Sequence, residues 1–297
     1  MDDSHKHGCI IIDKPRGITS FDVVREVRKL GKTRKVGHTG TLDPEATGVL
    51  ALALGRCTKL SKYLTLDEKV YAFEAKFGEA TETGDVEGEV IREASIEGVT
   101  ETSLEANLDA FRGAIEQVPP KFSAIKVDGT RAYELARAGE EFELDARTVQ
   151  VDEFELLSWE APVATFRVRC GPGTYIRSLV RDLGEALGSA AHALSIRRLR
   201  VGPFGIEEAV RLEELSVDSF WDRIVSPLEM VKSLGTLEVR DEELEDIRHG
   251  RPLYRQGTWT KGEPVALHEP DGRLVAVAEC TSDEGEKLQI WPRRVMI

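Results

Sequence analysis

The 297-residue sequence has no long hydrophobic run. Its longest strongly apolar stretch, residues 49–54, is far shorter than the roughly 20 residues with which a helix crosses a bilayer. Residues 1–7 are mostly polar or charged, so we expect no secretory signal peptide. These absences argue against membrane and secreted proteins, and we expect a cytoplasmic protein with no membrane partner.

Cysteine is also scarce, and its four copies lie far apart, at Cys9, Cys57, Cys170 and Cys280. There is no CxxC pair, and no histidine is spaced to complete a zinc site with them. Because nothing indicates disulfides, a reducing compartment is the expected environment. We predict that all four cysteines are buried small side chains rather than reactive thiols.

The motifs of several large enzyme classes are missing. Gly31-Lys32-Thr33 resembles the end of a phosphate-binding P-loop, but the glycine that the motif requires five residues earlier is Glu26. The sequence contains no GxGxxG, HExxH or GxSxG pattern. ATPase, dinucleotide-binding, zinc-protease and α/β-hydrolase functions therefore have no support, and we expect neither a cofactor nor a metal ion.

The chain is acidic overall, with 53 Asp and Glu against 40 Lys and Arg and a net charge of −13. A uniformly acidic surface would repel nucleic acid. However, residues 14–62 carry eleven Lys or Arg and only four Asp or Glu, whereas residues 79–115 carry ten acids and two arginines. This asymmetry leaves room for a locally positive groove on an acidic protein.

Hydrophobic periodicity predicts strands over residues 71–77, 148–160 and 163–170, and helices over 104–116, 131–138 and 175–188. Residues 32–48 are expected to form one long loop, and 49–54 either a buried strand or the start of a helix. Short strands punctuated by Gly and Pro follow a change of composition near residues 231–235. They predict a small β-rich C-terminal unit of about sixty residues.

Residues 37–48 form the most informative stretch, because three glycines and one proline hold a histidine and two acids in an irregular loop. Asp43 precedes Pro44, a pair that is also common in ordinary surface turns. Asp43 and Glu45 could in principle form a glycosidase-like pair, but a two-residue spacing does not place carboxylates on opposite sides of a bond.

Two further positions carry candidate chemistry. Arg177 lies at the predicted start of a helix, where a cation is disfavoured unless an anionic partner compensates it. Tyr71 lies in a predicted strand, where an ordinary structural tyrosine is the simpler interpretation.

These stretches, taken together and in this order, resemble the TruB family of tRNA pseudouridine synthases, which isomerise uridine 55 in the T loop. The resemblance covers almost all of residues 8–205. Its carriers are Asp13-Lys14-Pro15, the 37–48 loop, 55–59, Tyr71, 81–88, 117–124, 173–188 and Arg197-Arg198-Leu199.

The resemblance implies an α+β fold with a mixed, mostly antiparallel sheet and flanking helices in a catalytic domain over residues 1–235. It implies an RNA-clamping insertion near 121–147, which includes Tyr133, and a PUA-like RNA-binding domain over 236–297.

It also implies roles for individual residues. Asp43 matches the family nucleophile, Arg177 its ionic partner, and Tyr71 the tyrosine that stacks on the flipped base and is a candidate for removing the C5 proton. Among the substrate-binding positions, His38 matches a residue near the vacated base position, Lys14 and Lys59 match basic positions near the site, and Tyr175 and Ile196 match the walls of the base pocket. Ile196 replaces the leucine of relatives, a volume-conserving exchange.

The expected partner is tRNA, bound through its T-arm by a monomer without a guide RNA. Two alternatives stay open at this point: the catalytic subunit of a guide-RNA particle, and a tRNA-folding chaperone in which catalysis is secondary or lost.

Overall fold

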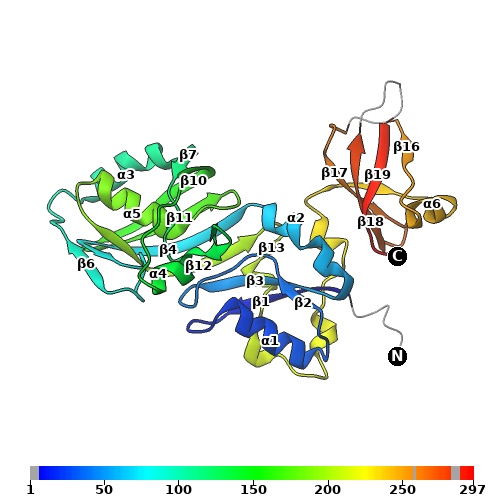
Figure 1. The fold of residues 1–297 in the computed structure, drawn as a ribbon, viewed down its shortest axis with the longest axis horizontal. Coiled ribbons are helices and arrows are strands. Elements are labelled where there is room, and N and C mark those ends of the chain that lie inside the picture. Colours follow the sequence, from blue (N-terminus) through cyan, green and yellow to red (C-terminus); the bar gives the residue numbers. More distant parts are fainter. Residues whose placement is uncertain (1–6, 257–258, 282–287) are drawn as a thin grey trace.

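The computed structural model describes residues 7–256, 259–281 and 288–297, which form a large mixed sheet flanked by helices and a smaller C-terminal sheet (Figure 1). The strands of the large sheet are β1 (Gly8–Lys14), β2 (Val36–His38), β3 (Thr47–Leu54), β4 (Lys69–Phe77), β7 (Gly113–Gln117), β10 (Arg147–Glu160), β11 (Val163–Cys170), β12 (Ala191–Val201), β13 (Phe204–Gly205) and β14 (Val210–Arg211). The α-helices are α1 (Ser20–Leu30), α2 (Ser61–Leu66), α3 (Glu101–Leu108), α4 (Ala132–Arg137), α5 (Ile176–Ala186) and α6 (Leu244–Arg248). Two small hairpins pair β5 (Glu79–Thr81) with β6 (Val90–Glu93), and β8 (Lys126–Val127) with β9 (Thr130–Arg131). This architecture confirms the predicted α+β class.

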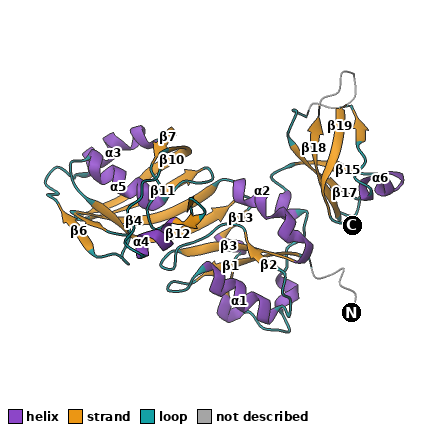
Figure 2. Ribbon diagram, in the orientation of Figure 1, coloured by secondary structure: helices purple, strands orange, loops and turns teal. Residues whose placement is uncertain are grey.

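The large sheet has the order β14-β1-β3-β12-β4-β11-β10-β7 and is mostly antiparallel. Among the described strands, only the β1–β14 and β3–β12 pairs of this sheet are parallel. Helix α1 packs beside β2 at one half of the sheet, while α3 and α5 pack on β10 and β12 at the other (Figure 2). None of the described helices is long and apolar enough to cross a membrane.

Strands β1 and β3 lie between two hydrophobic clusters, one on each face of the sheet. Along β3, Leu50 and Leu52 belong to the cluster under α1, whereas Val49 and Ala51 belong to the opposite cluster. Burial of both faces explains why residues 49–54 form a continuous apolar run without the alternation of a half-buried strand. The structure thus decides between the two interpretations of this stretch in favour of a strand.

Two sequence-based expectations were wrong in part. The long loop expected over 32–48 contains the short strand β2, which pairs with β3. The helix expected over 104–116 ends as α3 at Leu108, and residues 113–117 form β7, which pairs with β10. Helical geometry ends at Arg112, whose backbone is extended, and Gly113, the first residue of β7, has a left-handed φ of 79°.

The two halves of the large sheet meet at β12. This strand pairs with β4 along most of its length, but with β3 only at Arg197–Thr47 and Arg198–Gly48. The loop that precedes β3 therefore lies at the junction, beside the strand that carries Tyr71. The candidate site is built at this junction.

The C-terminal unit has the strand order β15-β17-β18-β19-β16. Its strands are β15 (Gly235–Glu238), β16 (Leu253–Arg255), β17 (Pro264–His268), β18 (Leu274–Thr281) and β19 (Leu288–Val295). Ala266, Leu274 and Val277 pack into the hydrophobic cluster that contains Ile11 of β1. The unit is therefore β-rich, as predicted, and it shares part of its packing with the large sheet.

A substitution at Gly48 can test how closely β3 and β12 approach each other. Its φ is 99°, and a Cβ atom there would lie 2.2 Å from the carbonyl oxygen of Arg198. We expect Gly48→Ala to lower the free energy of unfolding by about 3 kcal/mol, from backbone strain plus overlap. Denaturant titration with an unchanged m-value measures the loss.

Gly188→Ala is the matched control, because Gly188 has a φ of 67° but open space around it. It should cost only about 1 kcal/mol, the strain of the backbone alone. Equal losses for the two variants would show that close approach to Arg198 does not constrain Gly48.

Candidate active site

The loop of residues 39–46 joins β2 to β3 and is held by side chains from other elements. Lys14 Nζ donates to the carbonyl oxygens of Pro44 at 2.9 Å and Ala46 at 2.7 Å. Ser20 Oγ accepts from the Leu42 backbone N–H at 2.9 Å. Because buried backbone groups need partners, these bonds replace the strand ladder that the loop lacks.

Asp43 lies near the middle of this loop and pairs with Arg177, whose Nη2 is 2.9 Å from Asp43 Oδ2. The Arg177 side chain is only 4% exposed, whereas 37% of the Asp43 side chain remains accessible. Arg177 is the second residue of α5, near the positive end of the helix dipole. The carboxylate of Asp43, with that of Asp85 at 3.6 Å, supplies the negative charge that this placement requires.

The backbone also fixes the Arg177 guanidinium. It donates to the carbonyl oxygens of Thr83 and Phe122, each at 2.8 Å. Because its partners come from three separate segments, the guanidinium is held in a single orientation. The guanidinium in turn fixes the orientation of the Asp43 carboxylate.

Burial raises the pKa of the Asp43 carboxyl above its usual range. The charge and hydrogen bond of Arg177 oppose this shift, and the nearby Asp85 adds to it. Arg177 is thus the main group that favours the ionised form of Asp43.

Tyr71, Tyr175 and Ile196 line one cavity of about 330 Å³ together with Asp43 and Arg177. A cavity of this size is in the range of small-molecule sites. Of the eight candidate site residues from the sequence, these five are brought together here.

The wall formed by Tyr175 is fixed from both sides. Gln117 Oε1 accepts from the Tyr175 backbone N–H at 2.8 Å, and the Arg147 guanidinium lies 4.9 Å from the centroid of the Tyr175 ring. This cation–π contact joins the C-terminal end of the 121–147 insertion to the cavity wall.

The other three candidates lie elsewhere. Lys14 is 0% exposed and uses its ammonium on backbone carbonyls, so it supports the Asp43 loop from within rather than presenting a charge to a ligand. Lys59 is exposed on the short 3₁₀ helix of residues 55–60 and does not line the cavity. His38 ends β2 outside the cavity lining, and its buried Nδ1 has no hydrogen-bond partner among the described residues. Burial, together with the charges of Arg198 and Arg131, lowers the pKa of His38.

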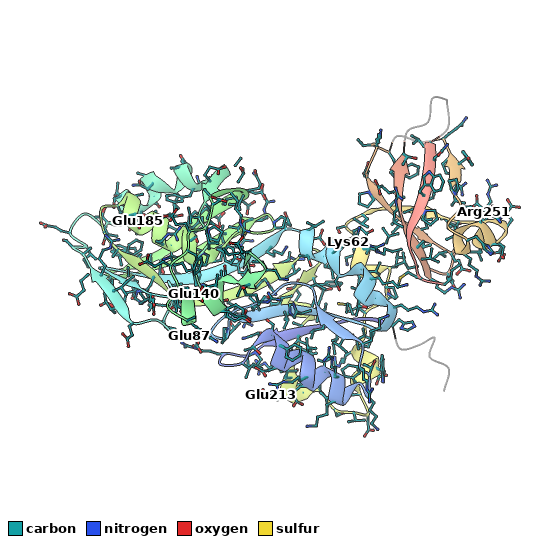
Figure 3. The ribbon with its side chains drawn as sticks, in the orientation of Figure 1. Lys62, Glu87, Glu140, Glu185, Glu213 and Arg251 are labelled. Atoms are coloured by element: carbon teal, nitrogen blue, oxygen red, sulfur yellow. The ribbon has the colours of Figure 1, made fainter. Side chains whose placement is uncertain are left out.

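A second cavity, of about 500 Å³, adjoins the first, and Asp43 and Arg177 line both. Its lining is acidic and includes Glu82, Asp85 and Glu87, the last of which is labelled in Figure 3. Among the described residues, no group of His, Cys, Asp or Glu is arranged to hold a metal ion.

Two residues of the site were not singled out from the sequence. Asp85 is 6% exposed and faces Arg177, and Arg198 is 2% exposed and lines the smaller cavity. Both lie in stretches that carry the family resemblance, but nothing in their local pattern distinguishes them from surface charges.

The arrangement has defined chemical abilities. A carboxylate that is open on one side and held by a guanidinium can attack an electrophilic carbon or accept a proton. A phenol in the same cavity provides a stacking surface and a proton-transfer group.

Comparison with known proteins identifies the same family as the motifs in the sequence. The model described as "TruB family pseudouridylate synthase (N terminal domain)" matches residues 28–176, and that of the "tRNA pseudouridylate synthase B C-terminal domain" matches residues 177–231. The "tRNA pseudouridine synthase B" of Thermobifida fusca is 42% identical over 96% of this chain and 98% of its own length. That of Pseudomonas aeruginosa is 40% identical over 97% and 95%.

Solved structures are similar over the whole chain. The structure described as "Crystal Structure of a Cbf5-Nop10-Gar1 Complex" has a TM-score of 0.79 and 28% identity, covering 99% of this chain and 86% of that one. The structure described as "Structure of H/ACA RNP bound to a substrate RNA containing 2'-deoxyuridine" has a TM-score of 0.76 and 27% identity, covering 98% and 85%. These findings confirm the resemblance in the sequence, and the chain belongs to the TruB family of pseudouridylate synthases.

Proposed function

We propose that this protein converts uridine 55 in the T loop of tRNA to pseudouridine, with Asp43 as the nucleophile. The observation that carries the proposal is the convergence of Asp43, Arg177 and Tyr71 on one cavity, with Asp43 and Arg177 2.9 Å apart. The substrate class is supported by the relatives, whose names specify tRNA.

The reaction is an isomerisation, so its atoms balance without a cofactor. The N1–C1′ bond of the uridine breaks, the uracil turns, and a C5–C1′ bond forms. The C5 proton then leaves and N1 gains a proton. The target base must leave the RNA stack to reach a cavity of this depth. Asp43 either attacks C1′, attacks C6 of the ring, or assists a glycal route.

Tyr71 has two tasks in this proposal. Its ring stacks on the flipped uracil, and its hydroxyl takes part in removing the C5 proton. Tyr175 and Ile196 form the walls against which the base is held.

The RNA backbone would lie over the basic segment of residues 14–62. Lys59 is exposed there, and His38 ends the strand that leads into the Asp43 loop. The insertion of residues 121–147, with α4 and Tyr133, borders the acidic cavity and would close over the T-arm.

We propose a monomer that acts on tRNA without a guide RNA. The relatives named tRNA pseudouridine synthase B are 40–42% identical to it, whereas the solved structures of a Cbf5-Nop10-Gar1 complex and of an H/ACA RNP are 27–28% identical. The high TM-score of those components keeps the guide-dependent activity as the second candidate. Activity of the purified protein on transcribed tRNA, with no other component, separates the two.

The unit over residues 236–297 is proposed to be a PUA-like RNA-binding domain that follows a catalytic domain over residues 1–235. Several of its arginines pair with acids, among them Arg273 with Glu269 and Arg293 with Glu279. Arg251, at the outer edge of the unit in Figure 3, pairs with Asp246. Such pairs reduce the charge that is available to phosphate.

Replacing the proposed nucleophile tests the function directly. Asp43→Asn keeps the shape of the side chain but removes the charged oxygen, so it should abolish pseudouridine formation while tRNA affinity stays within about tenfold. Pseudouridine mapping of treated tRNA gives the product and its position, and filter binding gives the affinity.

Glu45→Gln is the matched control, because Glu45 lies in the same loop but pairs with Arg16 at the surface. It should retain near-normal turnover. Substantial turnover by Asp43→Asn would remove Asp43 from the nucleophile role, and product at another uridine would refute the T-loop assignment.

Replacing Tyr71 separates its two tasks. Tyr71→Phe keeps the stacking ring, worth about 1–3 kcal/mol, so RNA binding should be normal while single-turnover product formation is severely reduced. Tyr71→Leu should lose binding as well. Full activity of the Phe variant would exclude a role of the hydroxyl, and identical behaviour of Phe and Leu would exclude stacking.

Substitutions of Lys261 and Arg294 test whether the C-terminal unit binds RNA. Among the described residues, no carboxylate lies within ion-pair distance of either side chain, so both charges are available to phosphate. If both contact phosphate, Lys261→Ala/Arg294→Ala should weaken tRNA binding and make the slope of log K against log salt shallower by about 0.7–0.9 per contact. The single-turnover rate at saturating tRNA should not change.

The double substitution is preferable to deleting the unit, since deletion would expose the cluster that contains Ile11. Arg248→Ala, which removes an arginine paired with Glu245, is the control. An unchanged salt slope in the double variant would contradict an RNA-binding role for these two residues.

A further inference from the structure

Arg198 is a buried cation at the junction of the two halves of the sheet. It is 2% exposed and lies on β12, where it is the register partner of Tyr71 on β4 and of Gly48 on β3. Directly opposed residues of an antiparallel pair project to the same face. Arg198 and Tyr71 accordingly line the same cavity as Asp43.

The guanidinium of Arg198 binds the backbone that leads into and out of the Asp43 loop. It donates to the carbonyl oxygens of Gly40 at 3.2 Å and Thr41 at 3.3 Å, before Asp43, and to that of Val49 at 2.7 Å, after it. A planar guanidinium can serve several acceptors in fixed directions at once, which a lysine ammonium cannot. Arg198 therefore fixes the loop on the side that faces Tyr71.

Tyr71 needs a positively charged neighbour if it is to accept a proton from carbon, because only its phenolate form can do so. The side chain is buried, and burial raises the pKa of the phenol, which disfavours its anionic form. The positive charge of Arg198, which lines the same cavity as Tyr71, opposes that shift, whereas the charge of Asp43 adds to it.

We propose that Arg198 is a positioning residue that fixes the Asp43 loop and, with the same guanidinium, stabilises the phenolate of Tyr71. The phenol first gives its own proton to solvent, the phenolate oxygen then accepts the C5 proton, and N1 takes a proton from solvent, so that the net change is one proton moved from C5 to N1. This inference rests on the proposed function, because it requires Tyr71 to act on uracil C5. It adds a link between the two reacting groups, which come from segments that are distant in the sequence.

The variants Arg198→Lys and Arg198→Gln test the proposal. Lysine keeps a positive charge but cannot serve the three carbonyls and Tyr71 together, and glutamine can donate to one carbonyl without a charge. Both should reduce the single-turnover rate at saturating T-arm RNA by about tenfold or more, with RNA affinity within about threefold. Thermal unfolding shows whether each variant is folded. If one of the two variants does not fold, the other still tests the proposal.

An isotope effect distinguishes preparation of Tyr71 from support of the loop. With RNA that carries deuterium at C5 of the target uridine, slower proton removal should raise the isotope effect of both variants above that of the wild type. Incorporation of 3-fluorotyrosine at position 71, which makes the phenol more acidic, should recover part of the lost rate. A purely structural defect changes neither readout in this way.

Arg200→Met is the matched control, because Arg200 lies on the same strand but is 40% exposed and pairs with Glu207. It should keep the wild-type rate and isotope effect. Wild-type rates in folded Arg198 variants, or reduced rates with an unchanged isotope effect and no recovery by fluorotyrosine, would overturn the inference. Absence of product from the wild-type protein would instead refute the proposed function itself.

Discussion

The site depends on how the carbonyl groups of an irregular loop find donors inside the protein. The loop of residues 39–46 carries Asp43 but has no ladder of its own, and an unsatisfied buried carbonyl costs about 1–3 kcal/mol. Lys14 supplies donors from β1 and Arg198 from β12. Two buried cations thus hold the backbone on either side of a carboxylate, and neither is free to leave without exposing unpaired groups.

The need for buried donors explains why basic side chains gather at one cavity of an acidic protein. The chain has a net charge of −13, yet the smaller cavity is lined by Arg177, Arg198 and Lys69. Burial lowers the pKa of Lys14 and of Lys69 to about 8, the charge of Arg198 adds to both shifts, and nearby acidic groups oppose them only in part. Positive side chains therefore line the smaller cavity, whereas Glu82, Glu87 and Glu89 line the other.

How far the sequence predicts this site depends on the range of the interactions. The apolar spacing of residues 175–188 and the alternation of 163–170 are local, and both elements appear as α5 and β11 within one or two residues of the predicted ends. The candidate positions Asp43, Arg177 and Tyr71 were singled out because the family motifs in which they lie imply a role for each. Arg198 also lies in such a motif, but its role was not recognised, because its carbonyl partners at Gly40 and Thr41 lie more than 150 residues away in the chain. The burial of Lys14 was not foreseen for a related reason: it is the last residue of a strand that is buried on both faces, and its amino group lies inside the protein.

Strand β1 extends the same dependence to the C-terminal unit. Ile10 and Ile12 pack in the cluster under α1, while Cys9 and Ile11 pack in the cluster that Ala266, Leu274 and Val277 of the C-terminal sheet enter. The strand then ends at Lys14, whose ammonium holds the Asp43 loop. Because packed cores are stiff on this length scale, a shift of the C-terminal sheet would be resisted by the strand that positions the catalytic loop. The C-terminal sheet and the Asp43 loop are therefore joined through one stiff strand, and a force on the C-terminal unit would be transmitted to the loop through β1.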